Sequence, residues 1–313
     1  MELILVGSIY SIIVLAMSIF VTIPLSNWIA TRVGAIDFPG EIKVHSEPTP
    51  RLGGLGILLA FILSIGVVIA TTDVSSSMTN QLVVLLALLS CLGIIGYLDD
   101  VQDLKPLLRL VIEGIIGVIL AISILGANAS WIALIIAWFW IVGLINAYNF
   151  LDGLDGLAAS VATTNLLALG TILFISGNSL FALVAVTMAL ATCGFLRFNW
   201  PPASIFMGDI GSLSLGFIIS ALSLILVASE SFSTNSMLAV ILAAILPLGD
   251  LVATVLRRSF SGKSLFEGDR GHFYDVLVDR ASLSKPQAMY VSLFMALLVG
   301  SLSIIVFNLN IAS

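Results

Sequence analysis

Charged residues are scarce in this sequence. Only 10% of its 313 residues are Asp, Glu, Lys or Arg and 59% are hydrophobic, whereas soluble domains carry about 25% charged residues. The mean hydropathy is +1.17. This composition excludes an ordinary soluble protein and predicts a polytopic helical membrane protein. The net charge of −6 and the pI of about 4.7 also argue against nucleic acid as a partner.

Cysteine is nearly absent, and the start of the chain lacks basic residues. Cys91 and Cys193 both lie inside apolar runs, so no disulfide framework is expected. The first apolar run follows Glu2 without a basic segment and is longer than the hydrophobic region of a typical signal peptide. We therefore interpret it as a retained span. With no recognisable repeat and no sign of a soluble domain, residues 1–313 are predicted to form a single integral-membrane domain.

About ten apolar runs approach the roughly 20 residues that a helix needs to cross a bilayer. The runs cover 3–26, 53–71, 81–98, 107–126, 130–148, 157–175, 179–197, 212–228, 236–256 and 288–308. They predict an all-α membrane protein with about ten transmembrane helices. Only GANA separates the fourth run from the fifth, which indicates a tight hairpin.

Basic residues are missing from every second loop between the predicted spans. All twelve Lys and Arg residues fall in or next to the loops of one side, and the opposite loops near 72–79, 127–129, 176–178 and 229–235 have none. The positive-inside rule places the basic side in the cytoplasm and both termini on the non-cytoplasmic side.

Most acidic residues accompany the basic ones. The polar segments cover 37–54, 97–106, 146–156, 198–212 and 257–280. A transporter would place its key polar groups at mid-membrane in broken helices. Polar groups gathered at one surface instead favour an enzyme that joins a water-soluble substrate to a lipid.

Asn149, Asp152 and Asp155 recur at every third position where a span ends. On a helix this spacing would place the three side chains on one face. Gly153 and Gly156 beside them leave room for backbone or a ligand to approach closely. Acids at the edge of a span cost free energy unless water, a cation or a ligand satisfies them. The pattern therefore predicts a polar site for a metal or a phosphorylated ligand.

Asp99 and Asp100 are adjacent at the end of the third span. Such a pair in a half-dry site tends to hold Mg²⁺ or to share a proton, whereas the alternative, a solvated helix end, is disfavoured by the helix dipole. Lys105 and Arg109 follow, four residues apart. They form either a cationic strip for a phosphate or an ordinary anchor on the positive side of the membrane.

Gly208 and Gly211 flank Asp209 directly before another span. The N–H groups of a glycine turn at a helix start suit an anion, and an acid there suits a bridging cation. Capping of the helix by Asp209 or Ser212 is the structural interpretation, and it is compatible with the functional one.

The two histidines both lie in the polar segments. His45 stands near Lys43 and Arg51 in a loop stiffened by prolines. His272 closely follows Arg270. Each histidine has either a structural role or a contact with phosphate.

Asp250 lies inside a span, where a buried acid needs a partner. The expected partners are Arg109, Arg257 and Arg258.

Two alternative functions are suggested by acids in or at the ends of the spans. A proton-coupled transporter would use Asp250 and Glu113, but the missing repeat and the one-sided polarity disfavour it. An intramembrane aspartyl protease is suggested by acids that follow glycines at span ends, but no GxGD sequence occurs.

Five segments resemble, in the same order, those of the polyprenyl-phosphate N-acetylhexosamine-1-phosphate transferases, glycosyltransferase family 4. They read KVHSEPTPRLGG, GYLDD, NAYNFLDGLDGLA, FMGDIGS and PLGD…RR…DRGH, and the resemblance covers nearly the whole chain. It implies transfer of an N-acetylhexosamine 1-phosphate from a UDP-sugar to undecaprenyl phosphate or another polyprenyl phosphate. The implied cofactor is Mg²⁺, with Mn²⁺ as a possible substitute, and the implied location is the cytoplasmic face of a bacterial inner membrane. A homodimer is a possible assembly.

The resemblance also implies roles for individual residues. Asp209 would be the main Mg²⁺ ligand, with Asp99 and Asp152 as further ligands. Asp99 and Asp100 would place or deprotonate the lipid phosphate. Asp152 and Asp155, the other expected catalytic acids, would hold the nucleotide end. The expected substrate-binding residues are Lys43, His45, Arg51, Lys105, Arg109, Asn149, Phe206 near the uracil, Gly208, Ser212, Arg270 and His272.

One segment departs from the family pattern. Many members carry His-x-His-His after Asp-Arg, whereas His272 is here followed by Phe273, Tyr274 and Asp275. Because the resemblance implies that this loop approaches the sugar, the identity of the sugar stays open. The HFYD form resembles members that start O-antigen of lipopolysaccharide or similar glycans, and a 6-deoxy-N-acetylhexosamine is one candidate.

Overall fold

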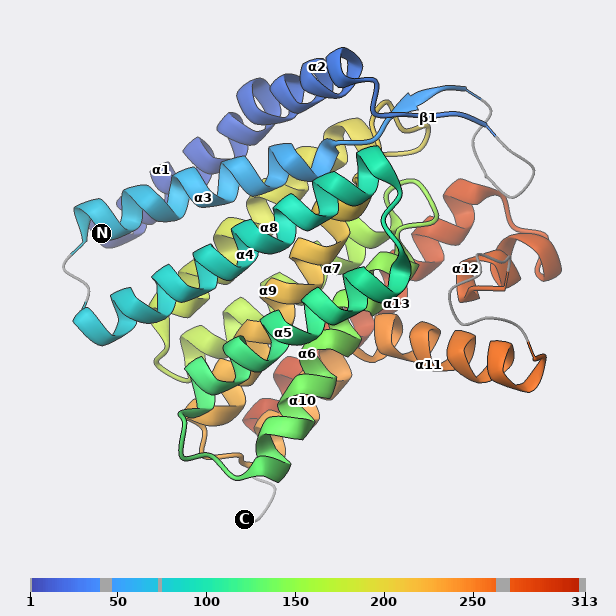
Figure 1. Ribbon diagram of the computed structural model, residues 1–313. Coiled ribbons are helices and arrows are strands. Elements are labelled where there is room, and N and C mark those ends of the chain that lie inside the picture. The colour runs from blue at the N-terminus through green and yellow to red at the C-terminus, as the bar shows by residue number, and fades with distance from the viewer. Residues whose placement is uncertain (1, 40–46, 73–74, 263–270, 310–313) are drawn as a thin grey trace.

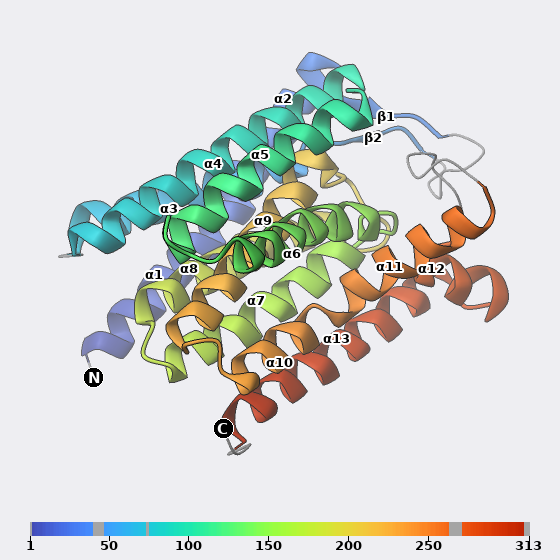
Figure 2. The same ribbon diagram turned by 60° about the horizontal axis from the view of Figure 1, so that its bottom comes forward.

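The computed structural model describes residues 2–39, 47–72, 75–262 and 271–309. This part of the chain is a bundle of long helices that run side by side between two ends of the molecule (Figures 1 and 2). Nine of the described helices are long and apolar enough to cross a membrane, and a bent pair, counted as one span, gives a tenth. The prediction of an all-α protein with about ten membrane helices is confirmed.

The helices follow the predicted order of apolar runs. The membrane helices are α1 (Glu2–Met17) with α2 (Ile23–Val33), α3 (Gly53–Thr71), α4 (Ser76–Gln102), α5 (Pro106–Leu125), α6 (Trp131–Leu151), α7 (Leu157–Ile175), α8 (Ser179–Asn199), α9 (Gly208–Ser229), α10 (Thr234–Ala243) with α11 (Ile245–Phe260), and α13 (Lys285–Asn308). The predicted hairpin at GANA joins α5 to α6. Two short strands, β1 (Ile36–Asp37) and β2 (Thr49–Pro50), pair antiparallel. A single turn, α12 (Phe273–Asp275), precedes a π-helical segment, Val276–Arg280.

Two spans are interrupted near prolines. A π-helical segment, Ser18–Thr22, joins α1 to α2 just before Pro24, which has no N–H to continue the helical ladder. The expected continuous span over 236–256 is corrected to two helices, α10 and α11, with a bend of 69° between them. Pro247 cannot donate to the carbonyl of Ala243, which weakens the helix at that point.

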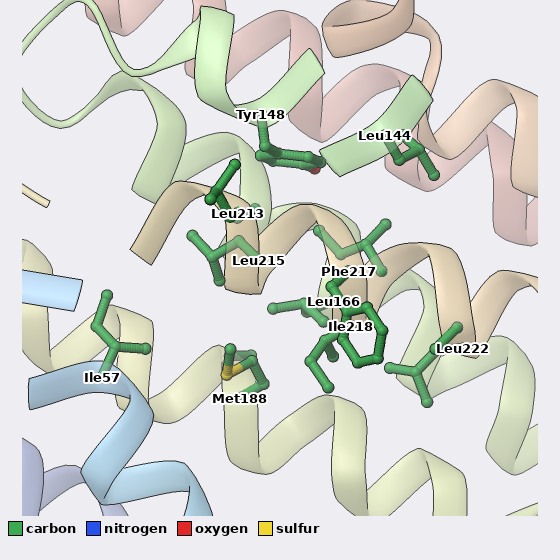
Figure 3. Packing of buried hydrophobic residues seen from close by; sticks show 14 of the residues in the cluster. Ile57, Leu144, Tyr148, Leu166, Met188, Leu213, Leu215, Phe217, Ile218 and Leu222 are labelled. Carbon is green, nitrogen blue, oxygen red and sulfur yellow. The ribbon is translucent and has the colours of Figure 1, made fainter. Parts of the chain in front are cut away.

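Helix α9 is the centre of the bundle. Its membrane-spanning part is completely buried, and both ribbon views show it enclosed by other helices (Figures 1 and 2). Leu213, Phe217 and Leu222 of α9 lie in one apolar cluster with Leu144 of α6 and Met188 of α8 (Figure 3). Because lipid is as apolar as a protein core, close packing stabilises this centre more than removal from water does.

Glycines let neighbouring helices approach α9 closely. A Cβ on Gly216 would lie 2.6 Å from the Cα of Ile145 in α6. At the end of the bundle with the polar segments, a Cβ on Gly96 of α4 would lie 2.6 Å from the backbone N of Ile210. Small residues at helix crossings permit such backbone contacts. These crossings fix the position of the first turn of α9, which carries Asp209.

Gly216→Ala is expected to destabilise the protein. The added methyl would meet backbone atoms of α6 that cannot rotate away, and overpacking of a core typically costs about 1–3 kcal/mol. Gly66→Ala is the matched control, because Gly66 lies in the membrane helix α3 and a Cβ there would meet nothing within 4 Å. Thermal unfolding in detergent should show a lower melting temperature for Gly216→Ala only. Equal melting temperatures would contradict the close crossing of α6 and α9.

The two ends of the bundle differ in charge. Figure 2 shows the start of α1 and the end of α13 at one end, and β1, β2 and α12 at the other. The described loop residues at the first end include no Lys or Arg. The orientation relative to the cytoplasm stays a prediction, which a reporter fused after Ser313 would test. The reporter should be found on the non-cytoplasmic side. A cytoplasmic signal would show that a span has been miscounted.

Candidate active site

An open cleft of about 900 Å³ lies where the polar segments meet. Its walls come from the ends of α4, α5, α6 and α9, from α11, and from the loops and short elements between the helices. Acids and amides that are far apart in the sequence therefore share one space at one end of the membrane bundle.

The guanidinium of Arg109 joins the separate motifs of the cleft. Its Nη1 lies 2.7 Å from Asp99 Oδ2 and 2.5 Å from Asp209 Oδ2. Its Nη2 donates to Asn149 Oδ1 at 3.2 Å. The Nδ2 of Asn149 in turn donates to Asp209 Oδ1 at 3.0 Å and to Ser212 Oγ at 3.2 Å. One arginine of α5 thus connects α4, α6 and α9.

Asp100 caps helix α9 from the neighbouring helix α4. Its carboxylate accepts the N–H groups of Asp209 at 3.1 Å and Ile210 at 3.3 Å, which a helix start otherwise leaves without partners. A Cβ on Gly208 would lie 2.5 Å from Asp100 Oδ2, so glycine is needed for this approach. The expected capping by Asp209 or Ser212 is wrong, since no side chain of α9 or its N-cap residue caps it. The carboxylate of Asp209 is left to face the cleft.

Asp152 and Asp155 lie in a turn. Helix α6 ends directly before Asp152, and α7 begins directly after Gly156. The expected helical face that would carry Asn149, Asp152 and Asp155 is therefore wrong, although all three residues line the cleft. Gly153 and Gly156 explain the break, because glycine has low helix propensity. Gly156, the residue directly before α7, also adopts a φ of 75°, a left-handed conformation that glycine tolerates readily.

Asp155 and Asn199 hold the loop between α8 and α9. Asp155 Oδ2 accepts the N–H of Ala203 at 3.0 Å. Asn199 Oδ1 accepts the N–H of Gly156 at 2.9 Å, and its Nδ2 donates to the carbonyl of Ile205 at 2.9 Å. The acidic turn after α6 and the loop that leads to α9 are thereby fixed to each other.

Asp250 pairs with His272. Asp250 Oδ2 lies 2.7 Å from His272 Nδ1, and Asp250 Oδ1 accepts the N–H of Phe273 at 2.7 Å. The expectation of an arginine partner is therefore wrong for the described contacts of Asp250. The ring of His272 stacks on Tyr274 with centroids 5.4 Å apart and meets the edge of Phe150. These contacts fix the imidazole with its Nδ1 already engaged, which leaves Nε2 for other partners.

Most of the predicted site residues meet at this cleft. The ones that line it are Arg51, Asp99, Asp100, Arg109, Asn149, Asp152, Asp155, Phe206, Gly208, Asp209 and His272. Ser212 is buried behind the wall and contacts Asn149. Lys105 is exposed and does not line the cleft, because it is the N-cap residue outside the regular turns of α5. Lys43, His45 and Arg270 lie outside the described residues.

Acidic side chains outnumber basic ones in the cleft. The described lining includes eight aspartates and three arginines. Burial, followed by the negative charges of Asp209, Asp100 and Asp155, raises the pKa of Asp152 well above the usual range of aspartate. A cation would relieve this crowding of carboxylates, and an oxygen-only set of donors suits Mg²⁺.

The carboxylates do not form a closed metal cage. No set of three or more acidic, His or Cys side chains in the described parts of the chain is arranged to hold a metal ion by itself. The predicted ligands Asp99, Asp152 and Asp209 do not form such a set either. A bound Mg²⁺ would therefore need further ligands, such as substrate phosphates.

Among the residues in and behind the cleft that were not predicted as part of the site, three are connected to its arginines or its aromatic wall. Glu113 contacts Arg109 from the membrane side, and Asn146 contacts Glu113. The spacing of four between Arg109 and Glu113 was the available signal. Arg258 lines the cleft with its guanidinium carbon 5.3 Å from the ring centroid of Phe150, and the sequence indicated it only as a partner of Asp250.

The fold and the cleft define a class of protein: a multi-pass membrane protein with an acidic, arginine-containing site at one membrane surface. Residues 82–227 match the model of glycosyl transferase family 4. The chain is 30% identical over 346 residues to the decaprenyl-phosphate N-acetylglucosaminephosphotransferase of Mycobacterium tuberculosis, covering 98% of this chain and 83% of that protein.

Two further relatives have names of the same kind. The protein of Bacillus subtilis named probable undecaprenyl-phosphate N-acetylglucosaminyl 1-phosphate transferase is 29% identical over 85% of this chain and 76% of its own length. The undecaprenyl-phosphate alpha-N-acetylglucosaminyl 1-phosphate transferase of Escherichia coli is 26% identical over 88% of this chain and 78% of its own length. The chain belongs to the polyprenyl-phosphate N-acetylhexosamine-1-phosphate transferase family, glycosyl transferase family 4.

Proposed function

We propose that the protein transfers an N-acetylhexosamine 1-phosphate from a UDP-sugar to undecaprenyl phosphate or another polyprenyl phosphate and releases UMP. The names of the relatives state polyprenyl-phosphate acceptors and N-acetylglucosamine phosphate transfer. The observation that carries the proposal is the meeting of Asp99, Arg109, Asn149 and Asp209 in one open cleft at the end of a membrane bundle. A lipid phosphate from the bilayer and a nucleotide from water can both reach such a place.

In the proposed reaction, an oxygen of the polyprenyl phosphate attacks the phosphorus that carries the sugar. A new P–O bond forms, and the P–O bond to UMP breaks. One bond to phosphorus replaces a similar one, so the reaction is expected to be readily reversible. A two-step route through a phosphorylated aspartate is the alternative way to exchange the same bonds.

Positive charge is the main catalytic need of this reaction. Both substrates are anions, and negative charge grows on the departing UMP. Arg51, Arg109 and Arg258 line the cleft and supply part of the countercharge. Mg²⁺, or Mn²⁺ in its place, would supply the rest and polarise the phosphate oxygens when bound. Asp209 and Asp99 are the residues that would hold it, with Asp152 as a further ligand.

The other residues of the cleft position these groups. Asp100 fixes the first turn of α9 through its two backbone contacts. Asn149 orients the carboxylate of Asp209. Asp155 fixes the wall assigned to the nucleotide. Asp99, at the end of α4, would place or deprotonate the lipid phosphate.

The proposed setting is the cytoplasmic face of a bacterial inner membrane. The product, an N-acetylhexosamine joined to the polyprenyl carrier by a diphosphate, would start a lipid-linked cell-envelope glycan such as O-antigen. The HFYD segment places Tyr274 against the turn after α6, where a Cβ on Gly153 would meet the tyrosine side chain. This contact supports a role of the segment at the wall of the cleft where the sugar would lie.

A panel of UDP-N-acetylhexosamines tests the proposal and identifies the sugar. Purified protein is incubated with each UDP-sugar, undecaprenyl phosphate and Mg²⁺, and the lipid products are analysed by mass spectrometry. UDP-N-acetylglucosamine, its 4-epimer and 6-deoxy forms are included. We expect at least one sugar to give a polyprenyl diphosphate sugar, and none to do so without the lipid. No lipid product from any sugar would contradict the proposal.

A further inference from the structure

Glu113 is a buried acid in the membrane part of α5. Its side chain has no exposed surface, and it does not line the cleft. A carboxylate at this depth is costly unless its surroundings compensate it, so acids inside membrane helices usually have a function. The proposed reaction brings Glu113 into contact with neither substrate.

Two neighbours hold the carboxylate of Glu113. Asn146 of α6 donates from Nδ2 to Oε2 at 2.5 Å and also to the carbonyl of Val142 at 3.0 Å. The Nε of Arg109, one helical turn away, lies 3.3 Å from Oε1. Within the described residues Oε1 has no hydrogen-bond partner. The ion pair with Arg109 is therefore what compensates this oxygen.

Arg109 is contacted from two opposite sides. Its Nη1 faces Asp99 and Asp209 in the cleft, and its Nε faces Glu113 in the membrane. The guanidinium is planar, with N–H directions that are fixed relative to one another. The negative charge of Glu113 beside Nε therefore favours the orientation in which Nη1 reaches the cleft. Without it, the positive charge of Arg109 would be shared by the two cleft carboxylates alone.

We propose that Glu113, anchored by Asn146, is a positioning residue that balances the charge of Arg109 from behind while Nη1 contacts Asp99 and Asp209. By sharing this charge, Glu113 leaves the two cleft carboxylates with more negative charge for a divalent cation and keeps the guanidinium in place beside the phosphate that is transferred. The inference rests on the proposed function, because it assigns Glu113 to the same site.

Glu113→Gln is the first test. The variant keeps the size of the side chain and its contact with Asn146, but it removes the charge that faces Arg109. Residues that orient metal ligands from behind are typically worth about 10–100-fold. We expect kcat to fall by about this factor, with a KM for the UDP-sugar that changes by less than about threefold. Glu230→Gln, at the opposite end of the bundle, is the matched control and should keep full activity. An unchanged kcat in Glu113→Gln would overturn the inference.

Cation binding gives a readout that does not depend on turnover. Mn²⁺ is titrated into the purified protein without substrates and followed by electron paramagnetic resonance. Glu113→Gln should weaken Mn²⁺ binding by about 10-fold, whereas a residue needed only for packing would change the melting temperature and not the affinity. If Glu113→Gln does not fold, Glu113→Asp keeps the buried charge and withdraws it from Arg109. It should show the same changes to a smaller degree, and wild-type values in it would equally overturn the inference.

A double-mutant cycle tests whether Glu113 acts through Arg109. Lysine lacks the planar guanidinium that Glu113 would position, so in an Arg109→Lys background Glu113→Gln should change kcat by less than about twofold. The same loss in both backgrounds would contradict the inference. Failure of the proposed function is distinguishable, because the wild-type protein would then show no lipid-dependent release of UMP. The Mn²⁺ titrations would still decide the role of Glu113.

Discussion

Asp209→Asn is expected to abolish turnover, with kcat at least about 10³-fold below that of the wild type. Asp209 lies in the first turn of α9, 2.5 Å from Arg109 Nη1 and 3.0 Å from Asn149 Nδ2. A helix start favours bound phosphate, so this carboxylate is well placed to bridge a cation to the diphosphate of the substrate. An amide of the same shape loses the charge that would hold Mg²⁺, and its NH2 group cannot accept from Arg109 or Asn149 as a carboxylate oxygen does.

The Asp209→Asn protein should still fold, because Asp100 and not Asp209 caps α9. Release of UMP measures turnover, and Mn²⁺ titration measures cation affinity; both should fall while the melting temperature stays close to that of the wild type. Asp279→Asn is the control, since Asp279 is an exposed acid that does not line the cleft. Activity of Asp209→Asn within a few-fold of the wild type would exclude Asp209 from the cation site.

Asp99→Asn is expected to lower kcat by about 10²–10⁴-fold, the usual cost of losing a general base, while the UDP-sugar still binds. Asp99 lies on α4, where its Oδ1 accepts the N–H of Leu104 at 2.7 Å and its Oδ2 meets Arg109. Asp152 and Asp155 belong to a different wall, the turn after α6. Asp152→Asn or Asp155→Asn should therefore weaken binding of the UDP-sugar in the absence of lipid.

Calorimetric titration of the UDP-sugar into each detergent-solubilised variant, followed by a separate turnover assay, divides these roles. Loss of nucleotide binding in Asp99→Asn, with binding intact in both variants of the turn, would reverse the assignment. Trapping of a phosphorylated aspartate with the UDP-sugar alone would instead make one of these acids a nucleophile. The titrations therefore assign a role to each cluster before they assign one to a single residue.

The sequence predicted the bundle and the location of the cleft because the membrane makes both patterns strong. Exposure of backbone polar groups to lipid is so costly that long apolar runs must be helices. Acids and bases are excluded from the apolar interior, so they collect at the helix ends. For this reason the order of apolar and polar segments was enough to place the motifs around Asp99, Asp152 and Asp209, which are distant in the sequence, at one surface.

The contacts within the site could not be predicted, because they depend on how separate helices cross. Asp100 caps a helix that begins 108 positions later in the sequence, at Gly208, and no local pattern signals this. The spacing of Asn149, Asp152 and Asp155 suggested a helix. The segment forms a turn instead, because glycine has a low helix propensity and Gly156 adopts a left-handed conformation. The pairing of Asp250 with His272 was similarly unpredictable, because it depends on how the chain returns to α11 after that helix has ended.

The fate of the phosphate next to the sugar is the most direct measurement of what this protein does. A UDP-sugar labelled in that phosphate is incubated with the protein, undecaprenyl phosphate and Mg²⁺, and the lipid and the released nucleotide are separated. Transfer of a sugar 1-phosphate predicts that the label moves entirely to the lipid and that the released nucleotide is unlabelled UMP. Label that stays in the water-soluble fraction as UDP, with an unlabelled sugar on the lipid, would show transfer of the sugar alone and contradict the proposed phosphotransfer.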